Sequence, residues 1–472
     1  EKVITARRAV LEFLLINHPL DCTICDQSGE CKLQDYCFEH GQAASRFTEE
    51  KNTYPQLEIG PDISRNMNRC IHCTRCIRYM RDIVGDEVLA LSERGHHTTV
   101  GPYLEKDIPS EFSLNLANIC PVGALTSRHF RFKGRAWLMK KTRTLCAGCA
   151  RGCNVFAWAC EGKILRLTPA ENDLVNKSWL CNPGYLSITD MQSSDRILKP
   201  TRSTAVEEAA AKIKAFIDNG QAAQVAVLAS PRLTNEDNFA IAKLAREVIG
   251  TESLAVVLGP QDPRPFDSTE QPLPEWFIRA DKNPNSHGAN DMINTVDEPK
   301  DARNIIDDVA SGAIRAMLIF SENPETAFSD YAGLIETLEN LDFLLVVDQK
   351  RSKTAELATL LVPEASFAEK DGTFTNEQGR IQKLQAVIEP RGDSQSAWQT
   401  AQQLAGFLGA AWKYKTAADI SDEIAAKIPG YQELNFDNIP AEGIQLQQAE
   451  PEAAKESEAT DIEAVDGKDP DA

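Results

Sequence analysis

The sequence predicts an α/β multidomain protein in which small α+β modules at the N-terminus, organised around cysteine ligands, precede a larger α/β domain. Its 472 residues give a prior of about three domains, each long enough to bury a core. All thirteen cysteines lie between Cys22 and Cys181. After residue 205, Ala-rich helical windows alternate with short β-like runs, which is typical of βαβ units around a parallel sheet.

Charge and hydropathy exclude two classes of partner. The net charge of −20 argues against nucleic acid, because neutralising phosphates requires clustered Lys and Arg. The apolar runs are far shorter than the ~18 residues of a membrane-spanning helix, so no direct membrane span is predicted. No secretory signal is recognisable, and since the sequence begins with Glu1 we expect an upstream segment to have been removed.

The cysteine pattern indicates metal ligation. An odd number of cysteines at close Cys-x2-Cys spacings, without a secretory signal, is typical of metal sites in a reducing compartment rather than of a disulfide framework. A helix predicted over residues 5 to 16 ends at Asn17 and His18-Pro19 and delivers a histidine to the first group of cysteines.

The first set of candidate ligands has the spacing His-x3-Cys-x2-Cys-x5-Cys and consists of His18, Cys22, Cys25 and Cys31. Four such ligands can close a tetrahedral zinc site or hold a 4Fe-4S cluster, and the spacing does not decide between the two. If a cluster is bound, a neutral imidazole in place of one thiolate should raise its reduction potential.

The second set has the spacing Cys-x2-Cys-x2-Cys followed by a distant Cys-Pro, and consists of Cys70, Cys73, Cys76 and Cys120. Three thiolates at this spacing favour one corner of a cubane cluster over zinc, which usually takes its ligands in pairs. The remote Cys-Pro is the ferredoxin arrangement of the fourth ligand.

The third set has the spacing Cys-x2-Cys-x3-Cys-x27-Cys and consists of Cys146, Cys149, Cys153 and Cys181. Alternating apolar residues at 155–158 and 164–167 predict a small sheet that carries this set. Cys37 and Cys160 are left over, and we interpret them as small buried hydrophobic residues.

Three further segments have distinct compositions. Residues 128–143 contain seven Lys and Arg interleaved with aromatic residues, which fits either a surface for an acidic neighbour or a solvated connector. Residues 260–300 are rich in Pro, Asp and Asn and predict a long irregular excursion. The C-terminal residues 436–472, acidic and poor in apolar residues, are predicted to be a disordered tail.

The ligand sets lie within four longer motifs: Asn17-His18-Pro19-Leu20-Asp21-Cys22, Gly29-Glu30-Cys31-Lys32-Leu33-Gln34-Asp35, Arg69-Cys70-Ile71-His72-Cys73 and Ile119-Cys120-Pro121-Val122-Gly123-Ala124. In this order they resemble the large iron–sulfur subunit (NuoG type) of bacterial respiratory complex I, an NADH:quinone oxidoreductase. The resemblance covers residues 1 to about 435. It implies three 4Fe-4S clusters, one on each set, the third of which occurs only in some bacteria.

Downstream, Ala368-Glu369-Lys370-Asp371-Gly372-Thr373-Phe374-Thr375-Asn376 and Glu377-Gln378-Gly379-Arg380 resemble the molybdopterin oxidoreductases, to which this subunit is related. The chain departs from the catalytic relatives at Pro183, where they commonly have Lys, and it has no cysteine after Cys181 to ligate molybdenum. Molybdopterin is therefore not expected, and the domain resembles a truncated remnant. The 2Fe-2S cluster of the family is expected only in a missing upstream domain or on another polypeptide.

The predicted domain order is a 4Fe-4S module with one histidine and three cysteine ligands at 1–60, a ferredoxin-like 4Fe-4S domain at 61–139, a 4Fe-4S domain of the molybdopterin-oxidoreductase type at 140–200, the molybdopterin-oxidoreductase-like remnant at 201–435 and the acidic tail at 436–472. The resemblance implies that the first two sets lie on the electron path.

The function implied is electron transfer from NADH and flavin towards quinone, coupled to ion translocation by the whole complex, with no catalytic residues and no independent active site in this chain. Implied partners are the flavin/NADH-binding and quinone-side iron–sulfur subunits of the peripheral arm, at the cytoplasmic face of the bacterial inner membrane. The alternatives are an iron–sulfur subunit of a soluble NAD-linked hydrogenase or formate dehydrogenase, and a non-redox zinc scaffold.

Overall fold

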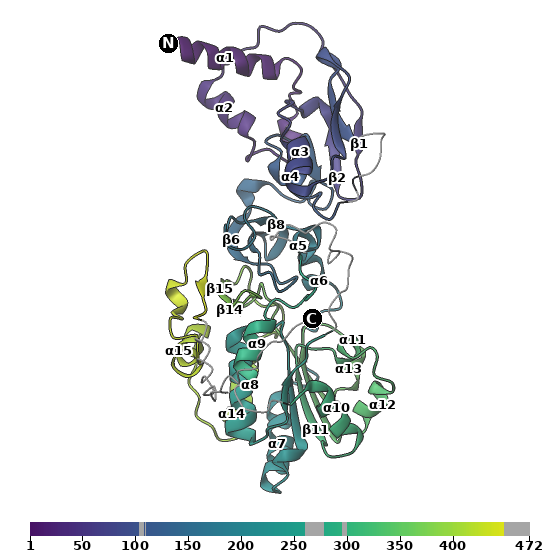
Figure 1. Ribbon diagram of the computed structural model, residues 1–472, viewed down its shortest axis with the longest axis vertical. Coiled ribbons are helices and arrows are strands. Elements are labelled where there is room, and N and C mark those ends of the chain that lie inside the picture. The colour runs from purple at the N-terminus through teal and green to yellow at the C-terminus, as the bar shows by residue number, and fades with distance from the viewer. Residues whose placement is uncertain (103–107, 109, 260–277, 295–299, 448–472) are drawn as a thin grey trace, which may run out of the picture.

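The computed structural model describes residues 1–102, 108, 110–259, 278–294 and 300–447. The molecule is elongated (Figure 1): the N-terminal modules occupy one end, the third cysteine region lies in the middle, and a parallel-sheet domain forms the other end. The α/β multidomain class expected from the sequence is confirmed. Within the described residues, no helix is long and apolar enough to cross a membrane.

The N-terminal helix predicted over residues 5 to 16 is α1, Lys2–Leu15, and a second helix, α2, spans Lys32–His40. The carboxyl end of α1 is capped by Lys51, whose Nζ donates to the carbonyl oxygens of Leu15 and Ile16 at 2.8 and 2.7 Å. A cation at this end also interacts favourably with the helix dipole. The residues that follow α1 are thereby held in place.

The next module combines two small antiparallel sheets with two short helices. One sheet has the strand order β1-β2-β5, with β1 Gln56–Glu58, β2 Ile63–Asn66 and β5 Leu125–Ser127. The other is a hairpin of β3, Leu89–Ser92, and β4, Thr99–Pro102. The helices are α3, Arg75–Arg78, and α4, Asn115–Ile119. Such small elements bury little apolar surface, which leaves the cysteine sites a large share in organising the module.

The small sheet predicted around the third set is confirmed. It has the antiparallel order β6-β7-β8, with β6 Lys140–Leu145, β7 Asn154–Cys160 and β8 Lys163–Pro169. Two short helices, α5 Asn182–Leu186 and α6 Ile188–Met191, follow it. The basic segment 128–143 is therefore partly a strand rather than only a connector, because its last residues form β6.

The predicted parallel sheet is present with the strand order β10-β9-β11-β12-β13. Its strands are β9 Val225–Ala229, β10 Leu254–Val256, β11 Ala316–Phe320, β12 Phe343–Asp348 and β13 Leu360–Pro363. The strands read as continuous apolar runs because both faces of the sheet are covered. The sequence predicted the first four and missed β13.

Helices cover both faces of this sheet (Figure 1). One face packs on α7 Ala205–Asp218, α8 Asn235–Lys243, α9 Ser286–Ile293, α14 Ala397–Phe407 and α15 Ala417–Lys427. The other packs mainly on α10 Ala302–Ala310, α12 Leu334–Glu339 and α13 Lys353–Leu357, with the short α11 at Pro324–Ala327. Residues that alternate along each strand supply the two cores.

Two predictions of irregular structure need correction. Within the excursion predicted at 260–300, residues 286–293 form α9, and residues 260–277 and 295–299 lie outside the described part. The predicted tail starts too early, because β16, Ile444–Gln445, pairs with β15, Arg380–Leu384, which also pairs with β14, Gly372–Thr375. The rest of the predicted tail, 448–472, lies outside the described residues.

A buried ion network fills the carboxyl edge of the parallel sheet. Lys370 Nζ lies 2.7 Å from Asp237 Oδ2 and 2.5 Å from Glu364 Oε1, and these side chains are almost completely buried. Arg196 pairs with Glu369 at 2.8 Å close by. In doubly wound sheets ligands bind at this edge, where the strand order reverses, here between β9 and β11. In this chain its own charged side chains occupy the region.

Replacing Lys370 should destabilise this domain. Lys370→Ala leaves two buried carboxylates without their cation and should lower the free energy of unfolding by about 3–5 kcal/mol. Urea unfolding of the full chain followed by circular dichroism measures the change. Lys353→Ala is the matched control, because it removes the lysine of an exposed pair with Glu325 and should cost less than about 1 kcal/mol. Equal unfolding midpoints for the two variants would contradict the role given to Lys370.

Candidate metal centres

The structure gathers the first set around a cavity of about 300 Å³ that opens between α1, α2 and the loop after Cys120. Cys22 begins a short 3-10 turn, and Cys31 stands at the N-cap of α2. The backbone amides of Leu33 and Gln34, in the first turn of α2, donate to the Cys31 sulfur. Helix amides directed at a sulfur favour its thiolate form.

His18 is placed as a metal ligand would be. It lines the same cavity as the three cysteines of the first set, and its Nδ1 is buried without a hydrogen-bond partner among the described residues. Burial lowers the pKa of His18, which keeps the imidazole in the neutral form that binds metals. A buried ring nitrogen without a partner is costly unless a ligand satisfies it.

The second set lines one small cavity with all four of its cysteines. Cys70 follows a 3-10 turn, Cys76 lies in α3, and Cys120 caps the carboxyl end of α4. Backbone amides donate to these sulfurs: that of His72 to Cys70 at 3.4 Å, and those of Val122 and Leu125 to Cys120. Such donors stabilise negative charge on the ligands.

The loop between the cysteines of the second set is locally strained. His72 and Thr74 have φ values of 52° and 59°, in the left-handed region that non-glycine residues avoid. For a β-branched residue such as Thr74 this costs roughly 1–2 kcal/mol. The strain turns the chain tightly enough for Cys70, Cys73 and Cys76 to line the same small cavity.

The third set is the most deeply buried, with all four cysteines less than 9% exposed. Cys146 follows β6, Cys153 precedes β7, and Cys181 is the N-cap of α5. The amide of Cys146 donates to the carbonyl of Cys153 at 2.8 Å and closes the loop. A methyl group added at Gly148 or Gly184 would lie 3.4 Å from the Cys146 sulfur, so glycine keeps the space beside this sulfur open.

Burial makes most of these thiols poor acids without a metal. It raises the pKa of Cys76 and Cys146 to about 12 and that of Cys120 to about 11, with neighbouring thiolates adding to the shift. A bound cation reverses this preference, since it stabilises the thiolates directly. No three His, Cys, Asp or Glu side chains in the described ranges are grouped as a single ion requires. Ligands of a 4Fe-4S cube stand further apart, because each binds a different iron.

The first and second sets touch directly. The amide of Lys32, next to Cys31, donates to the carbonyl of Pro121, next to Cys120, at 3.1 Å. Gly123, three residues after Cys120, faces Cys25 so closely that an added Cβ would lie 2.2 Å from the Cys25 sulfur. The loop that carries the last ligand of the second set therefore forms one wall of the first site.

The second and third sets are joined by buried amide side chains. Asn182, next to Cys181, donates to Asp62 and Ser113 at 2.7 and 2.8 Å and accepts from the amide of Leu114 at 3.0 Å. Asn115 and Leu180 exchange two further hydrogen bonds. The position after the last ligand of the third set is thus used to hold the neighbouring module.

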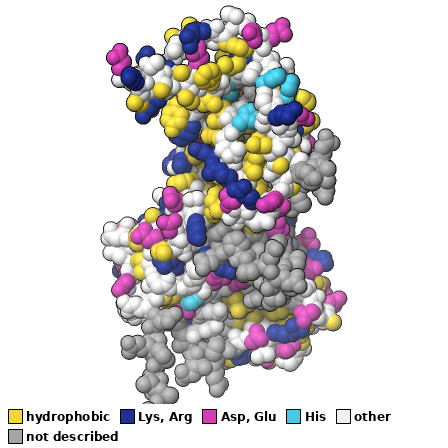
Figure 2. All heavy atoms as spheres, turned by 45° about the horizontal axis from the view of Figure 1, so that its top comes forward, with side chains coloured by type: hydrophobic (Ala, Val, Ile, Leu, Met, Phe, Trp, Pro, Cys, Tyr) yellow, Lys and Arg dark blue, Asp and Glu magenta, His cyan; other side chains and the backbone are white. Residues whose placement is uncertain are grey.

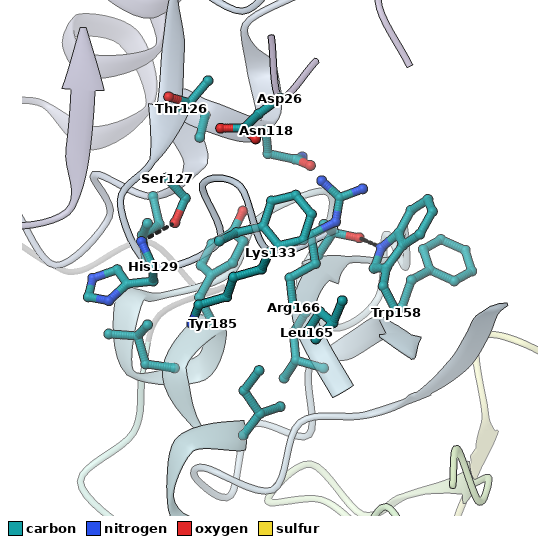
Figure 3. A pocket seen from close by; sticks show the side chains of 18 of the residues that line it. Asp26, Asn118, Thr126, Ser127, His129, Lys133, Trp158, Leu165, Arg166 and Tyr185 are labelled. Atoms are coloured by element: carbon teal, nitrogen blue, oxygen red, sulfur yellow. Dashed lines mark hydrogen bonds between the residues drawn. The ribbon is translucent and has the colours of Figure 1, made fainter. Parts of the chain in front are cut away.

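A cavity of about 490 Å³ lies where the three ligand regions meet (Figure 3). Arg166, in β8, reaches across it to Glu30, next to Cys31, and makes two hydrogen bonds of 2.8 and 2.7 Å. Its guanidinium stacks between the rings of Phe130 and Trp158, at 4.5 and 4.4 Å from the ring centroids. A bidentate, stacked arginine of this kind fixes the third region against the first.

The first site lies under an apolar surface. Cys22 is exposed, and large hydrophobic side chains around the first site are more than half exposed: Phe13, Leu20, Ile24, Tyr36 and Phe38. Figure 2 shows apolar side chains gathered over this end of the molecule. An exposed patch of this kind marks an interaction site more often than a free surface.

Sequence reasoning missed several of these residues. Cys37, interpreted as a buried hydrophobic residue, is half-buried and lines the first cavity, and Cys160 is also half-buried. Glu30 and Asn182 adjoin ligands, but their partners lie far away in the sequence. Only the adjacency to a ligand could have drawn attention to them.

Filling the space at Gly123 should remove the first site selectively. In Gly123→Ala the new methyl group would clash with the Cys25 sulfur, so iron content should fall by about four atoms per chain. Iron analysis with low-temperature EPR of the purified chain measures the loss. Gly406→Ala, with no atom near the added Cβ, is the control and should keep all of its iron. Full iron content in Gly123→Ala would show that Cys25 is not a ligand.

Four family models match successive parts of the chain. Residues 7–46 match the NADH-ubiquinone oxidoreductase-G iron-sulfur binding region, and residues 60–126 match the ferredoxin-like domain of NADH-quinone oxidoreductase subunit 3. Residues 139–193 match the molybdopterin oxidoreductase Fe4S4 domain, and residues 268–407 match molybdopterin oxidoreductase. The chain therefore contains several iron–sulfur binding regions before the parallel-sheet domain.

Among curated proteins, the NuoG-type subunit of the NADH-quinone oxidoreductase of Rickettsia felis is 36% identical over 276 residues, which are 56% of this chain and 40% of that protein. The corresponding subunit of Rickettsia prowazekii is 47% identical over 175 residues, 37% of this chain and 26% of that protein. The matches thus span less than half the length of these relatives. A solved NAD+-reducing [NiFe]-hydrogenase is 30% identical, with a TM-score of 0.27 over 28% of this chain and 58% of that one.

The relatives and the family models agree with the motifs that carry the candidate ligands. The resemblance predicted from the sequence is confirmed: the chain is an iron–sulfur protein similar to the NuoG-type subunit of NADH-quinone oxidoreductases.

Proposed function

We propose that this chain is the electron-transfer subunit of a respiratory NADH:quinone oxidoreductase, complex I, which relays electrons from NADH and flavin towards quinone. In the whole complex this transfer is coupled to ion translocation. The observation that carries the proposal is the contiguity of the three candidate ligand sets, which are joined by contacts between residues that flank the ligands. Contiguous centres are what electron relay requires.

The proposed ligands of three 4Fe-4S clusters are the twelve residues His18, Cys22, Cys25, Cys31, Cys70, Cys73, Cys76, Cys120, Cys146, Cys149, Cys153 and Cys181. Bound clusters of this type accept and release single electrons. The chain supplies geometry and potential: buried thiols exclude water, and backbone amides donate to the sulfurs. No general acid or base is needed, so no independent active site is assigned to this chain.

The first and second sets are assigned to the main route and the third set to a side position. The first set reaches the surface through Cys22, whereas the third set is buried between the second module and the parallel-sheet domain. Beyond the third set, the sheet edge that would hold a terminal acceptor is occupied by Lys370 and its carboxylates. For the same reason we assign no molybdopterin to this domain and regard it as a remnant.

The proposed partners are the flavin/NADH-binding subunit and the quinone-side iron–sulfur subunits of the peripheral arm, at the cytoplasmic face of the bacterial inner membrane. The exposed apolar side chains around the first site fit contact with another subunit. The 2Fe-2S cluster of the family is assigned to an upstream domain or a separate chain.

Metal analysis tests the ligand assignment. Three complete sets predict about twelve irons and twelve acid-labile sulfides per chain, without molybdenum or pterin. Iron, sulfide and molybdenum assays on anaerobically purified protein, with low-temperature EPR after reduction, measure these quantities. Stoichiometric zinc with no more than about four irons would refute the assignment, and pterin fluorescence after denaturation would refute the remnant.

Two serine substitutions test the division of labour. Cys73→Ser in the assembled complex should block NADH-to-quinone transfer, because it interrupts the main route. Cys149→Ser should mainly lower the amount of assembled complex, since metal binding at the third set ties residues 146 and 181 together. Activity normalised to flavin and rapid-mix EPR separate the effects. A fully assembled Cys149→Ser complex that cannot reduce quinone would place the third set on the route.

A further inference from the structure

A buried ion pair joins the two ligand sets assigned to the main route. Asp21 directly precedes Cys22 of the first set, and Arg69 directly precedes Cys70 of the second set. Arg69 donates from Nη2 and Nε to Asp21 Oδ2, at 2.6 and 3.1 Å. The Arg69 side chain is 7% exposed and that of Asp21 25% exposed. The pair therefore crosses the junction between the sets, forty-eight residues apart in the chain.

Arg69 lies closer to the first set than its place in the sequence suggests. An added Cβ at Gly123 would lie 3.4 Å from Arg69 Cδ and 2.2 Å from the Cys25 sulfur, so the arginine stem and this sulfur face each other across a gap of one methyl group. Burial raises the pKa of Cys25; among the neighbouring charges Arg69 opposes this shift and Asp21 adds to it. For Cys70, the nearby guanidinium that acts is that of Arg65.

Stability is a poor explanation for this pair. The desolvation of two buried charges offsets most of their attraction, so a buried ion pair contributes little net stability. The junction is also held by the hydrogen bond from Lys32 to Pro121, which involves no charge. What the pair does provide is two opposite charges at fixed positions beside the first site, each of which shifts the energy of an added electron.

We propose that Asp21 and Arg69 are positioning residues that set the reduction potential of the first site relative to the second, and with it the driving force for electron exchange between them. The exchange moves one electron from the reduced site to the oxidised site, so no further reactant is needed. This inference rests on the proposed function, since it requires a cluster at each set.

EPR-monitored redox titration of the full chain with its clusters tests the proposal. Asp21→Asn removes the negative charge with little change in shape and should raise the first midpoint potential, shifting the ratio of reduced to oxidised first site about tenfold, or about 59 mV for one electron, and the second much less. Arg69→Gln should lower the first potential, and Arg69→Lys, which keeps the charge, should leave it within about threefold. The double variant Asp21→Asn/Arg69→Gln should return towards wild type.

Arg81→Gln is the matched control, because Arg81 belongs to the second module and its pair with Asp82 is half exposed. It should shift neither potential. Equal shifts of both sites in Asp21→Asn, or no shift beyond that of Arg81→Gln, would overturn the proposal. If Asp21→Asn binds no cluster at the first set, Arg69→Lys decides: an unchanged first potential supports the proposal, and the same drop as in Arg69→Gln overturns it. A wild-type chain without either EPR signal contradicts the proposed function itself.

Discussion

The burial of thiols at the candidate sites is the constraint on which the N-terminal half depends. Buried thiolates are unfavourable without a cation, and burial raises the pKa of most of these cysteines. Metal binding therefore supplies folding free energy that the small apolar cores of these modules lack. Short helices, tight turns and left-handed residues such as Thr74 are tolerated because the ligands hold the chain in place.

The same constraint explains where the modules touch. The residues that join them stand next to ligands: Glu30 beside Cys31, Pro121 beside Cys120 and Asn182 beside Cys181. A ligand fixes the backbone of its neighbour, so the neighbour's polar groups point in defined directions and can make specific contacts. Contacts placed there couple the position of one site to that of the next, which a relay of electrons needs.

The sequence was informative wherever the signal was local. Ligand spacings span a few residues, and the buried strands β9, β11 and β12 are continuous apolar runs, so both could be predicted. The missed elements depend on distant partners. Ile444 forms β16 only because Ile381 lies opposite it, and Asn182 serves as a link because Asp62 and Ser113 come to meet it. Composition placed the boundary of the acidic tail too early for the same reason.

The parallel-sheet domain follows from a different balance. Its sheet is covered on both faces by helices and has two large apolar cores, so it needs no metal to fold. A doubly wound sheet leaves polar groups converging at its carboxyl edge, and these groups must find partners whether or not a ligand binds. Lys370 provides a partner for Asp237 and Glu364 at that edge. A cation from the chain itself thus completes the edge, and the domain can serve as a structural support for the third set.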